Sequence, residues 1–415
     1  MAERYPLRPI VVDEFDAFHA VSEQAFHEGP PSERQRAGML SRHELDRTLA
    51  AFDGSRPVSS AAIYSFQMCV PGALAAVGGV TFIAVLPAYR RQGILTAMMR
   101  RELDDMHERG ETLGALWASE AGIYGRFGYG RASRQATFTV RRGEGAFVRD
   151  APADPRLRLR VAEPDAVQAE LAKVYDTLLP AQPGMFSRNE AWWRRVLADP
   201  EEERQGAGAV HCLLAEDDAG PRGYALYKGH GRWDLDTFLP DAQLEVRELA
   251  STDPAATAAL WADLLHRDLV SEVTARLRPE DDPLLHLLAD PRRARPTIAD
   301  GLWVRVVDVP GALSLRRYPC PVDVVIEVID DGCPWNQGRW RLTVPAPGDT
   351  ASCTRTTDPA DVILPVSALG AAYLGSTKLG ALAAAGQATE LKTGMLNALS
   401  ATLTWDPAPW CPVIF

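Results

Sequence analysis

The sequence predicts an α/β and α+β protein: two mixed sheets flanked by helices, followed by a smaller α+β domain. Three observations lead to this prediction. A β-branched and aromatic run at residues 81–85 passes through a basic turn into helical apolar spacing from residue 94. A second strand-to-helix succession follows at residues 243–269, and alternating apolar strands begin near residue 302.

The first predicted domain covers residues 1–147. Its expected elements in chain order are helices at 16–26 and 44–52, strands at 58–67 and 74–85, a helix from 94, a strand at 113–119, a short helix at Tyr124 and a closing strand at 137–140. Because strands and helices alternate, we expect one mixed sheet with helices on both faces.

The second predicted domain covers residues 148–300 and follows a connector rich in Gly, Pro and charge. A strand at 157–161, a helix at 165–179, a strand at 243–249 and a helix at 254–269 repeat the order of the first domain. Asp253 and Pro254 suit the N-cap and first turn of that last helix. The Asp253 carboxylate would stand where a phosphate binds, so we expect this domain to lack a cofactor site.

The third predicted domain covers residues 301–415. Strands at 302–307, 324–329 and 339–344 precede helices at 366–374, 376–384 and 391–403. The tail from residue 405 is apolar, contains three prolines and ends in Phe415, whereas chain ends are normally polar and frayed. We therefore expect a docked tail, which would place the free α-carboxylate of Phe415 inside the protein.

The turn after the strand at 81–85 has the chemistry of a phosphate site. Unpaired N–H groups and aligned peptide dipoles make the start of a helix attractive to anions. Gly93 lets the backbone approach an anion closely, and Arg90 and Arg91 can donate charge-assisted hydrogen bonds. A pyrophosphate fits this arrangement; the alternative is a surface turn with solvated arginines.

This turn, read as Arg90-Arg-Gln-Gly93-Ile-Leu95, resembles the acetyl-CoA-binding motif of the GCN5-related N-acetyltransferases (GNAT). Leu95 replaces the last small residue of the motif. Residues 123–130 are similar to a Tyr-x-x-Phe-Gly-Tyr element of the same superfamily. Over its whole length the chain resembles the Eis (enhanced intracellular survival) family, through these motifs, Ser119-Glu120 and the aromatic C-terminus.

The Eis resemblance implies two GNAT-type domains, the second degenerate, then a sterol-carrier-protein-like domain. It also implies acetyl-CoA as co-substrate and a homohexamer. The strand at 82–85 would pair through its backbone with the pantetheine arm. The residues implied at acetyl-CoA are Ile83, Ala84, Val85, Arg90, Arg91, Gln92, Gly93, Ile94, Leu95, Thr96, Ser119 and Glu120.

Two catalytic groups are implied by the same resemblance. Tyr124 would be the general acid for the departing thiolate, and the ordinary tyrosine pKa of ~10 keeps its hydroxyl protonated at neutral pH. The carboxylate of Phe415 would act as the base, through water. The alternatives are a core tyrosine and a tail that only packs. Tyr129 is expected to pack.

Candidate acceptor contacts are Phe26, Glu28, Tyr64 and Phe66, although aromatic residues in strands more often belong to the core. Glu28 suits a cation. The net charge of −11 argues against nucleic acid and favours cationic small molecules such as aminoglycosides or polyamines.

Cysteine and histidine spacing suggests no metal site, since the six cysteines and eight histidines form no metal-binding motif. No apolar run approaches the ~20 residues that span a membrane, and no signal-peptide core is present. We expect a cytoplasmic, acetyl-CoA-dependent N-acetyltransferase that forms a homo-oligomer. Two other functions stay open: acetylation of protein lysines or N-termini, and non-catalytic sensing of acetyl-CoA or binding of a lipid.

Overall fold

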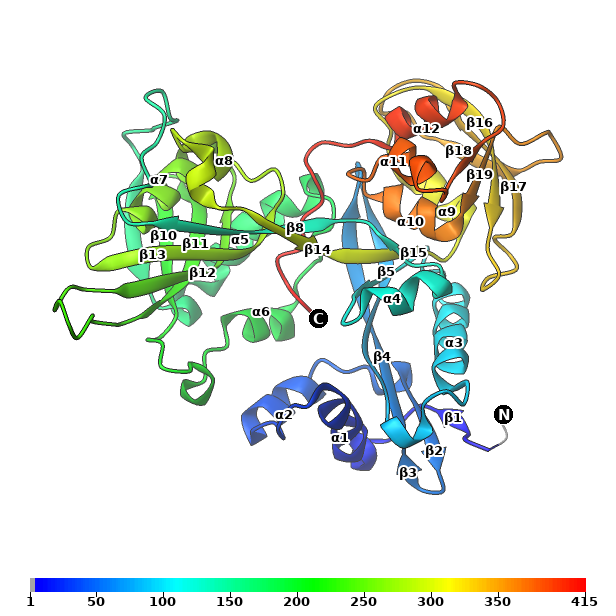
Figure 1. The fold of residues 1–415 in the computed structure, drawn as a ribbon, viewed down its shortest axis with the longest axis horizontal. Coiled ribbons are helices and arrows are strands. Elements are labelled where there is room, and N and C mark those ends of the chain that lie inside the picture. The colour runs from blue at the N-terminus through cyan, green and yellow to red at the C-terminus, as the bar shows by residue number, and fades with distance from the viewer. Residues whose placement is uncertain (1–3) are drawn as a thin grey trace. The chain divides into compact units, whose positions relative to one another are not determined.

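The computed structural model describes residues 4–415. The chain divides into two compact units, each made of more than one stretch of sequence. Figure 1 colours the chain by residue number. The first unit contains the residues up to 132, residues 302–406 and Phe415. The second unit contains residues 133–301 and 407–414.

An eight-stranded sheet forms the larger part of the first unit, in the order β1-β2-β4-β5-β6-β15-β7, with β3 paired to β2. Its strands are β1 (Leu7–Arg8), β2 (Thr48–Asp53), β3 (Arg56–Pro57), β4 (Ser59–Val70), β5 (Ala73–Val85), β6 (Leu113–Trp117), β7 (Gly130–Arg131) and β15 (Leu302–Val306). Its helices are α1 (Phe15–Phe26), α2 (Glu33–Leu40), α3 (Ile94–Glu108) and α4 (Ala121–Tyr124). Within this sheet β5 and β6 run parallel, which requires α3 as the crossover between them.

A five-stranded sheet in the order β18-β17-β16-β19-β20 completes the first unit. Its strands are β16 (Val322–Ile329), β17 (Gly338–Val344), β18 (Ser352–Arg355), β19 (Val362–Pro365) and β20 (Thr389–Glu390). The helices of this region are α9 (Val309–Leu315), α10 (Val366–Tyr373), α11 (Leu379–Ala384) and α12 (Met395–Leu403). β16 and β17 form the hairpin that the alternating pattern predicts.

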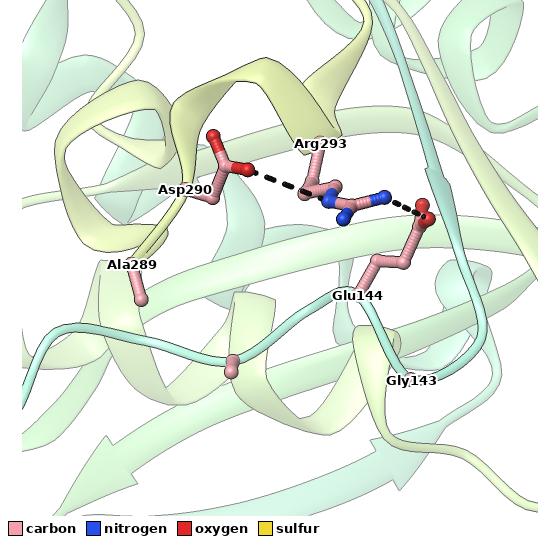
Figure 2. A pocket seen from close by; sticks show the side chains of 6 residues that line it. Gly143, Glu144, Ala289, Asp290 and Arg293 are labelled. Atoms are coloured by element: carbon pink, nitrogen blue, oxygen red, sulfur yellow. Dashed lines mark hydrogen bonds and ion pairs between the residues drawn. The ribbon is translucent and has the colours of Figure 1, made fainter.

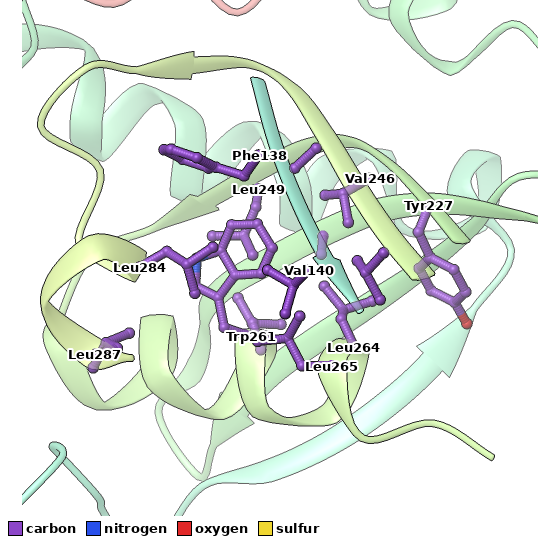
Figure 3. Close-up of a cluster of buried hydrophobic side chains, with 14 of the residues drawn as sticks. Phe138, Val140, Tyr227, Val246, Leu249, Trp261, Leu264, Leu265, Leu284 and Leu287 are labelled. Atoms are coloured by element: carbon purple, nitrogen blue, oxygen red, sulfur yellow. The ribbon is translucent and has the colours of Figure 1, made fainter. Parts of the chain in front are cut away.

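The second unit is built on a seven-stranded sheet in the order β14-β8-β13-β12-β11-β10-β9. Its strands are β8 (Arg134–Arg141), β9 (Arg158–Ala162), β10 (His211–Asp217), β11 (Gly220–His230), β12 (Ala242–Ser251), β13 (Val270–Pro279) and β14 (Thr297–Asp300). Its helices are α5 (Gln168–Leu178), α6 (Glu190–Leu197), α7 (Pro254–Leu265) and α8 (Leu284–Leu287). Trp261 of α7 lies at the centre of its core, against Phe138, Val140 and Leu249 of the sheet (Figure 3).

The predicted fold class is confirmed, but two strands lie in sheets other than those expected. Residues 137–140 were expected to close the first sheet, whereas β8 pairs with β13 and β14 in the second unit. Residues 302–307 were expected to begin the third domain, whereas β15 pairs with β6 and β7 in the first unit. Alternation identifies a strand but not its neighbour, which is why the sequence could not assign these two. The boundaries at residues 147 and 300 stay predictions.

The expected helix at 44–52 is wrong. A short 3-10 turn, Leu45–Arg47, leads instead into β2, whose residues 48–52 are all buried between β1 and β4. A short, continuous apolar run fits a buried strand as well as a buried helix, so periodicity does not separate the two. Among residues 4–415, no helix combines the length and apolar character that crossing a bilayer requires.

Candidate active site

The pairing between the parallel strands β5 and β6 ends halfway along β5. They pair from Val77 with Leu113 to Gly79 with Ala115, and β5 then runs on to Val85 with only β4 beside it in the described sheet. A bulge at residues 81–84 accompanies this divergence, and Phe82 within it has a positive φ of 53°. The predicted contacts Ile83, Ala84 and Val85 thus lie on the diverging part of β5, where an extended ligand can pair with the strand edge.

The start of α3 is open to an anion. Gly93 is its N-cap, with φ of 81°, and no side chain caps the helix and no acidic residue occupies its first turn. Ile94, Leu95 and Thr96 form that first turn, whose N–H groups have no partner within the helix. Leu95, which departs from the small residue of the motif, packs partly buried against apolar clusters of the sheet.

The basic turn before α3 is held in place by its own side chains. Arg90 donates from Nε to the Val85 carbonyl at 3.1 Å, and Gln92 donates to the Ala88 carbonyl at 3.3 Å. Arg91 has a positive φ of 61°. These contacts fix the path of the loop between β5 and Gly93, so the predicted phosphate contacts come together at one helix start.

Tyr124 lies where the strands diverge. It ends α4, is 4% exposed, and packs in one apolar cluster with Val80 and Leu116, the residues that follow the last β5–β6 pair. Burial raises the pKa of its hydroxyl, and a hydrogen bond with Ser119 acts in the opposite direction. Glu120 is the N-cap of α4. The hydroxyl is therefore protonated at neutral pH, and the tyrosine is buried beside the end of the β5–β6 pairing.

Phe415 lies at the same point of the sheet. Its ring packs against Phe66 of β4, with centroids 5.2 Å apart. A Cβ atom added to Gly79, the last β5 residue paired with β6, would lie 3.2 Å from the Phe415 ring and would clash with the Phe66 ring. The absence of a side chain at Gly79 is thus what lets the last residue of the chain rest on β5.

Aromatic rings continue from Phe415 along the first unit. Phe66 contacts Tyr64 at 5.9 Å between centroids, Tyr64 contacts His43 at 5.5 Å, and His43 contacts Phe82 at 5.0 Å. His19 joins this row against Phe82 at 4.8 Å. Tyr64 and Phe66, predicted as acceptor contacts, belong to this row. The other two, Phe26 and Glu28, lie at the exposed C-terminal end of α1.

Known protein families match most of the chain in sequence. Two family models of the acetyltransferase (GNAT) domain match residues 6–132 and 184–306, and a model of the sterol carrier protein domain matches residues 309–412. An uncharacterized N-acetyltransferase of Streptomyces avermitilis is 41% identical over 98% of both chains. The N-acetyltransferase Eis of Mycobacterium bovis is 34% identical over 85% of this chain and 84% of that one.

The chain belongs to the Eis family of N-acetyltransferases. The crystal structure of Eis1 from Mycobacterium abscessus superposes with a TM-score of 0.81 at 32% identity, covering 99% of this chain and all of that one. The predicted family and the prediction of an acetyltransferase enzyme are therefore confirmed.

The second GNAT-type region of this Eis-family chain has its helix start closed. In the β12–α7–β13 segment, the Asp253 carboxylate accepts from the N–H groups of Ala255 and Ala256 at 3.0 and 3.1 Å. Arg222 donates from Nε to the same carboxylate at 2.7 Å. The predicted N-cap role of Asp253 is confirmed, and the expectation that this domain lacks a cofactor site stays a prediction.

A hollow of about 270 Å³ in the second unit offers no rival site. It is lined by Gly143, Glu144, Ala146, Ala289, Asp290 and Arg293. Arg293 spans it, with ion pairs to Glu144 at 2.7 Å and Asp290 at 3.4 Å (Figure 2). Its polar groups thus satisfy one another. Residues 4–415 contain no group of three or more His, Cys, Asp and Glu side chains able to hold a metal ion.

Sequence reasoning missed three residues of the first unit that lie beside these elements. His19 is buried and His43 is half-buried among the aromatic rings, and Glu102 is buried on α3. His19 and Glu102 each occupy the apolar face of a helix, beside buried residues of α1 and α3. A polar residue at an apolar helical position was the available signal.

Proposed function

We propose that the chain acetylates amines of cationic small molecules, such as aminoglycosides or polyamines, with acetyl-CoA as the acetyl donor. The observation that supports this proposal is that Tyr124 packs with Val80 and Phe415 rests at Gly79, two neighbouring residues of β5 at the point where its pairing with β6 ends. A hydroxyl that can donate a proton and the residue that bears the α-carboxylate are thus both held by the part of β5 whose edge would pair with the extended arm of a coenzyme.

The residues present fit acetyl-CoA. The first-turn N–H groups of α3, with Arg90 and Arg91, would hold the pyrophosphate, and the free edge of β5 at Ile83 to Val85 would pair with the pantetheine arm. Acetyl-CoA supplies a thioester from which an amine can take the acetyl group. Ser119 and Glu120, between β6 and α4, complete the proposed contact set.

Tyr124 and Phe415 each carry out one of the two proton transfers of the proposed reaction. The Tyr124 hydroxyl gives its proton to the departing thiolate, because burial keeps the phenol neutral. The Phe415 α-carboxylate takes the proton from the attacking amine through water. An ordinary terminal carboxylate, with a pKa of ~3.5, is a weak base, so its placement against β5 rather than in bulk solvent is part of the proposal.

The contacting aromatic rings and the negative charge at the end of α1 support the proposed class of amine acceptor. Ring faces of Phe66, Tyr64 and Phe82 can attract an ammonium group. Glu23 and Glu28 add negative charge at the end of α1, and burial together with the Glu28 charge raises the pKa of Glu23. A polycation would relieve this repulsion between carboxylates, which favours polyamines and aminoglycosides over neutral amines.

The test is coenzyme A release from acetyl-CoA with a panel of aminoglycosides, polyamines, lysine peptides and N-terminal peptides. Turnover with a polycation that collapses in Tyr124→Phe supports the proposal, and Tyr227→Phe on β11 is the matched control. Preference for a peptide would instead establish a protein acetyltransferase. Acetyl-CoA binding without turnover of any amine would establish a sensor.

Assembly and location complete the proposal. We propose a homohexamer in the cytoplasm, on the strength of the family resemblance. Light scattering coupled to size-exclusion chromatography measures the mass directly, and a monomeric mass at micromolar concentration would contradict the proposed assembly.

A further inference from the structure

Two polar side chains lie buried without a hydrogen-bond partner beside Tyr124. Both carboxyl oxygens of Glu102 are buried and unpartnered within the described residues, and so is the hydroxyl of Tyr129. Glu102 is 3% exposed and Tyr129 is fully buried. Natural proteins nearly always satisfy such groups, so each one that is unsatisfied calls for an explanation.

Glu102 and Tyr129 lie around the same apolar cluster as Tyr124. Glu102 follows Met99 by three residues and precedes Met106 by four on α3, and both methionines pack in one apolar cluster with Tyr124 and Tyr129. The rings of Tyr124 and Tyr129 meet edge to face with centroids 6.2 Å apart. The Tyr129 hydroxyl lies against β6, 3.2 Å from where a Cβ atom on Gly114 would stand.

The apolar setting decides the charge of Glu102. Burial raises the pKa of its carboxyl well above the ordinary value, the Asp105 charge adds to the increase, and Arg47 opposes it. Arg47 is itself engaged by Asp105 and Glu111 at 2.9 and 2.7 Å, so its charge is already paired. Glu102 also interacts electrostatically with Tyr124 and Tyr129, and the Arg305 charge, paired with Asp330 at 2.7 Å, acts on Tyr129. A protonated Glu102 has an O–H donor, which a carboxylate lacks.

We propose that protonated Glu102 and Tyr129 form a neutral pair, hydrogen-bonded through one buried water, that positions Tyr124 for proton transfer to the leaving thiolate. This inference rests on the proposed role of Tyr124. Glu102 and Tyr129 are positioning residues, because neither touches the reacting atoms. Neutrality matters: a carboxylate at this place would disfavour the negative charge that Tyr124 acquires when it gives up its proton.

Substitution with leucine separates positioning from packing. In Glu102→Leu an apolar side chain replaces a buried carboxyl, so we expect the melting temperature to stay equal or rise. We expect kcat to fall roughly tenfold and the KM for acetyl-CoA to stay unchanged. A 1 Å misplacement of a reacting group can lower the rate ~10²-fold, and the loss of a positioning contact should displace Tyr124 by less than that. The exposed Glu108→Leu on the same helix is the control. A Glu102→Leu enzyme with wild-type kcat would overturn the proposal.

Substitution with glutamine tests the neutral state. Glu102→Gln keeps a neutral donor, so we expect near wild-type kcat at neutral pH. In the wild type, activity should decline as rising pH ionises Glu102, and the Gln variant should keep its activity to higher pH. Superimposable pH profiles would contradict the pair. Tyr129→Phe combined with Glu102→Leu should lose no more than either single change, because both remove the same pair.

Infrared spectroscopy of the ligand-free protein distinguishes failure of the pair from failure of the proposed function. At neutral pH the wild type should show the carbonyl stretch of a protonated carboxylic acid that is missing in Glu102→Gln. A protein that shows the band but turns over no amine would contradict the proposed function and leave the pair intact. An active enzyme without the band would contradict the Glu102–Tyr129 pair and leave the proposed function intact.

Discussion

Two strand-helix-strand segments of this chain share one order of elements and differ at the start of the helix. In β5–α3–β6 the N-cap is Gly93, which leaves the first-turn N–H groups available. In β12–α7–β13 the N-cap is Asp253, whose carboxylate takes two of those N–H groups and the Arg222 guanidinium. The two N-caps also differ in backbone conformation, with φ of 81° at Gly93 and −154° at Asp253. The Asp253 cap stabilises its helix, whereas on the proposed function the Gly93 helix start receives a phosphate.

The space where the strands part also differs between the segments. In the second unit Arg278 of β13 reaches across to the Leu249 carbonyl of β12 at 2.7 Å, and Trp410 donates its indole N–H to the Leu277 carbonyl. Side chains of the protein therefore fill that divergence. In the first unit the Phe415 ring rests on β5 at Gly79. Beyond Gly79, β5 runs on to Val85 with only β4 paired to it among the described residues. In the second unit, therefore, Arg278 and Trp410 occupy the place that the coenzyme arm would take in the first unit on the proposed function.

Gly93→Asp should have the largest effect, because it places an aspartate, the N-cap residue of α7, at the N-cap of α3. A carboxylate at the phosphate site is a like-charge contact costing several kcal/mol, so acetyl-CoA affinity should fall about 100-fold or more in calorimetric titration. Gly93→Asn is the matched control, since Asn also tolerates a positive φ but has no charge. Equal losses in both variants would mean that strain, not charge, governs the site.

Extending the chain by one glycine beyond Phe415 tests whether the terminus at β5 does chemistry or only fills space. Moving the carboxylate by one residue should lower kcat roughly 10- to 100-fold at unchanged acetyl-CoA affinity. The same extension at the N-terminus is the control. Wild-type turnover from the extended chain would reduce Phe415 to a packing residue.

Gly79→Ala probes how tightly the Phe415 end of the tail fits. The added Cβ would clash with the Phe66 ring and press on Phe415, so we expect a loss of about 1–3 kcal/mol in stability and reduced kcat. At Gly122 on α4 an added Cβ meets no atom within 4 Å, so Gly122→Ala should change little. Thermal unfolding and initial rates measure both, and a neutral Gly79→Ala would show that the rings can move aside.

Asp253→Ala should have the smallest effect, about 1 kcal/mol of stability from the lost N-cap, with no second acetyl-CoA bound per chain. Burial acts to raise the pKa of Asp253, but Arg222 and the N–H of Ala256 outweigh it, so the pKa is lowered. This stabilisation is therefore present above the unfolded pKa and lost as pH falls through the folded one. The difference in urea unfolding between wild type and variant should shrink below about pH 4, whereas Asp253→Asn, which keeps the cap, should stay closer to wild type.

Local chemistry was predictable from the sequence, and the choice of partner strands was not. Strand, basic turn and Gly93 helix start were evident because each depends on neighbouring residues. Asp253 was recognised as a cap for the same reason. By contrast, β8 and β15 have ordinary strand patterns, and only pairing over long sequence separation assigns them to their sheets. The aromatic tail indicated docking, but its rest against Gly79 depends on a residue far away in the chain.

The place of Phe415 has a consequence for how the proposed base can be altered. Residues 407–414 belong to the second unit and Phe415 to the first. On the proposed mechanism the base is a main-chain carboxylate, so no exchange of the Phe415 side chain removes it. A survey of side-chain substitutions would therefore miss this base, and only a change in where the carboxylate stands would reveal it.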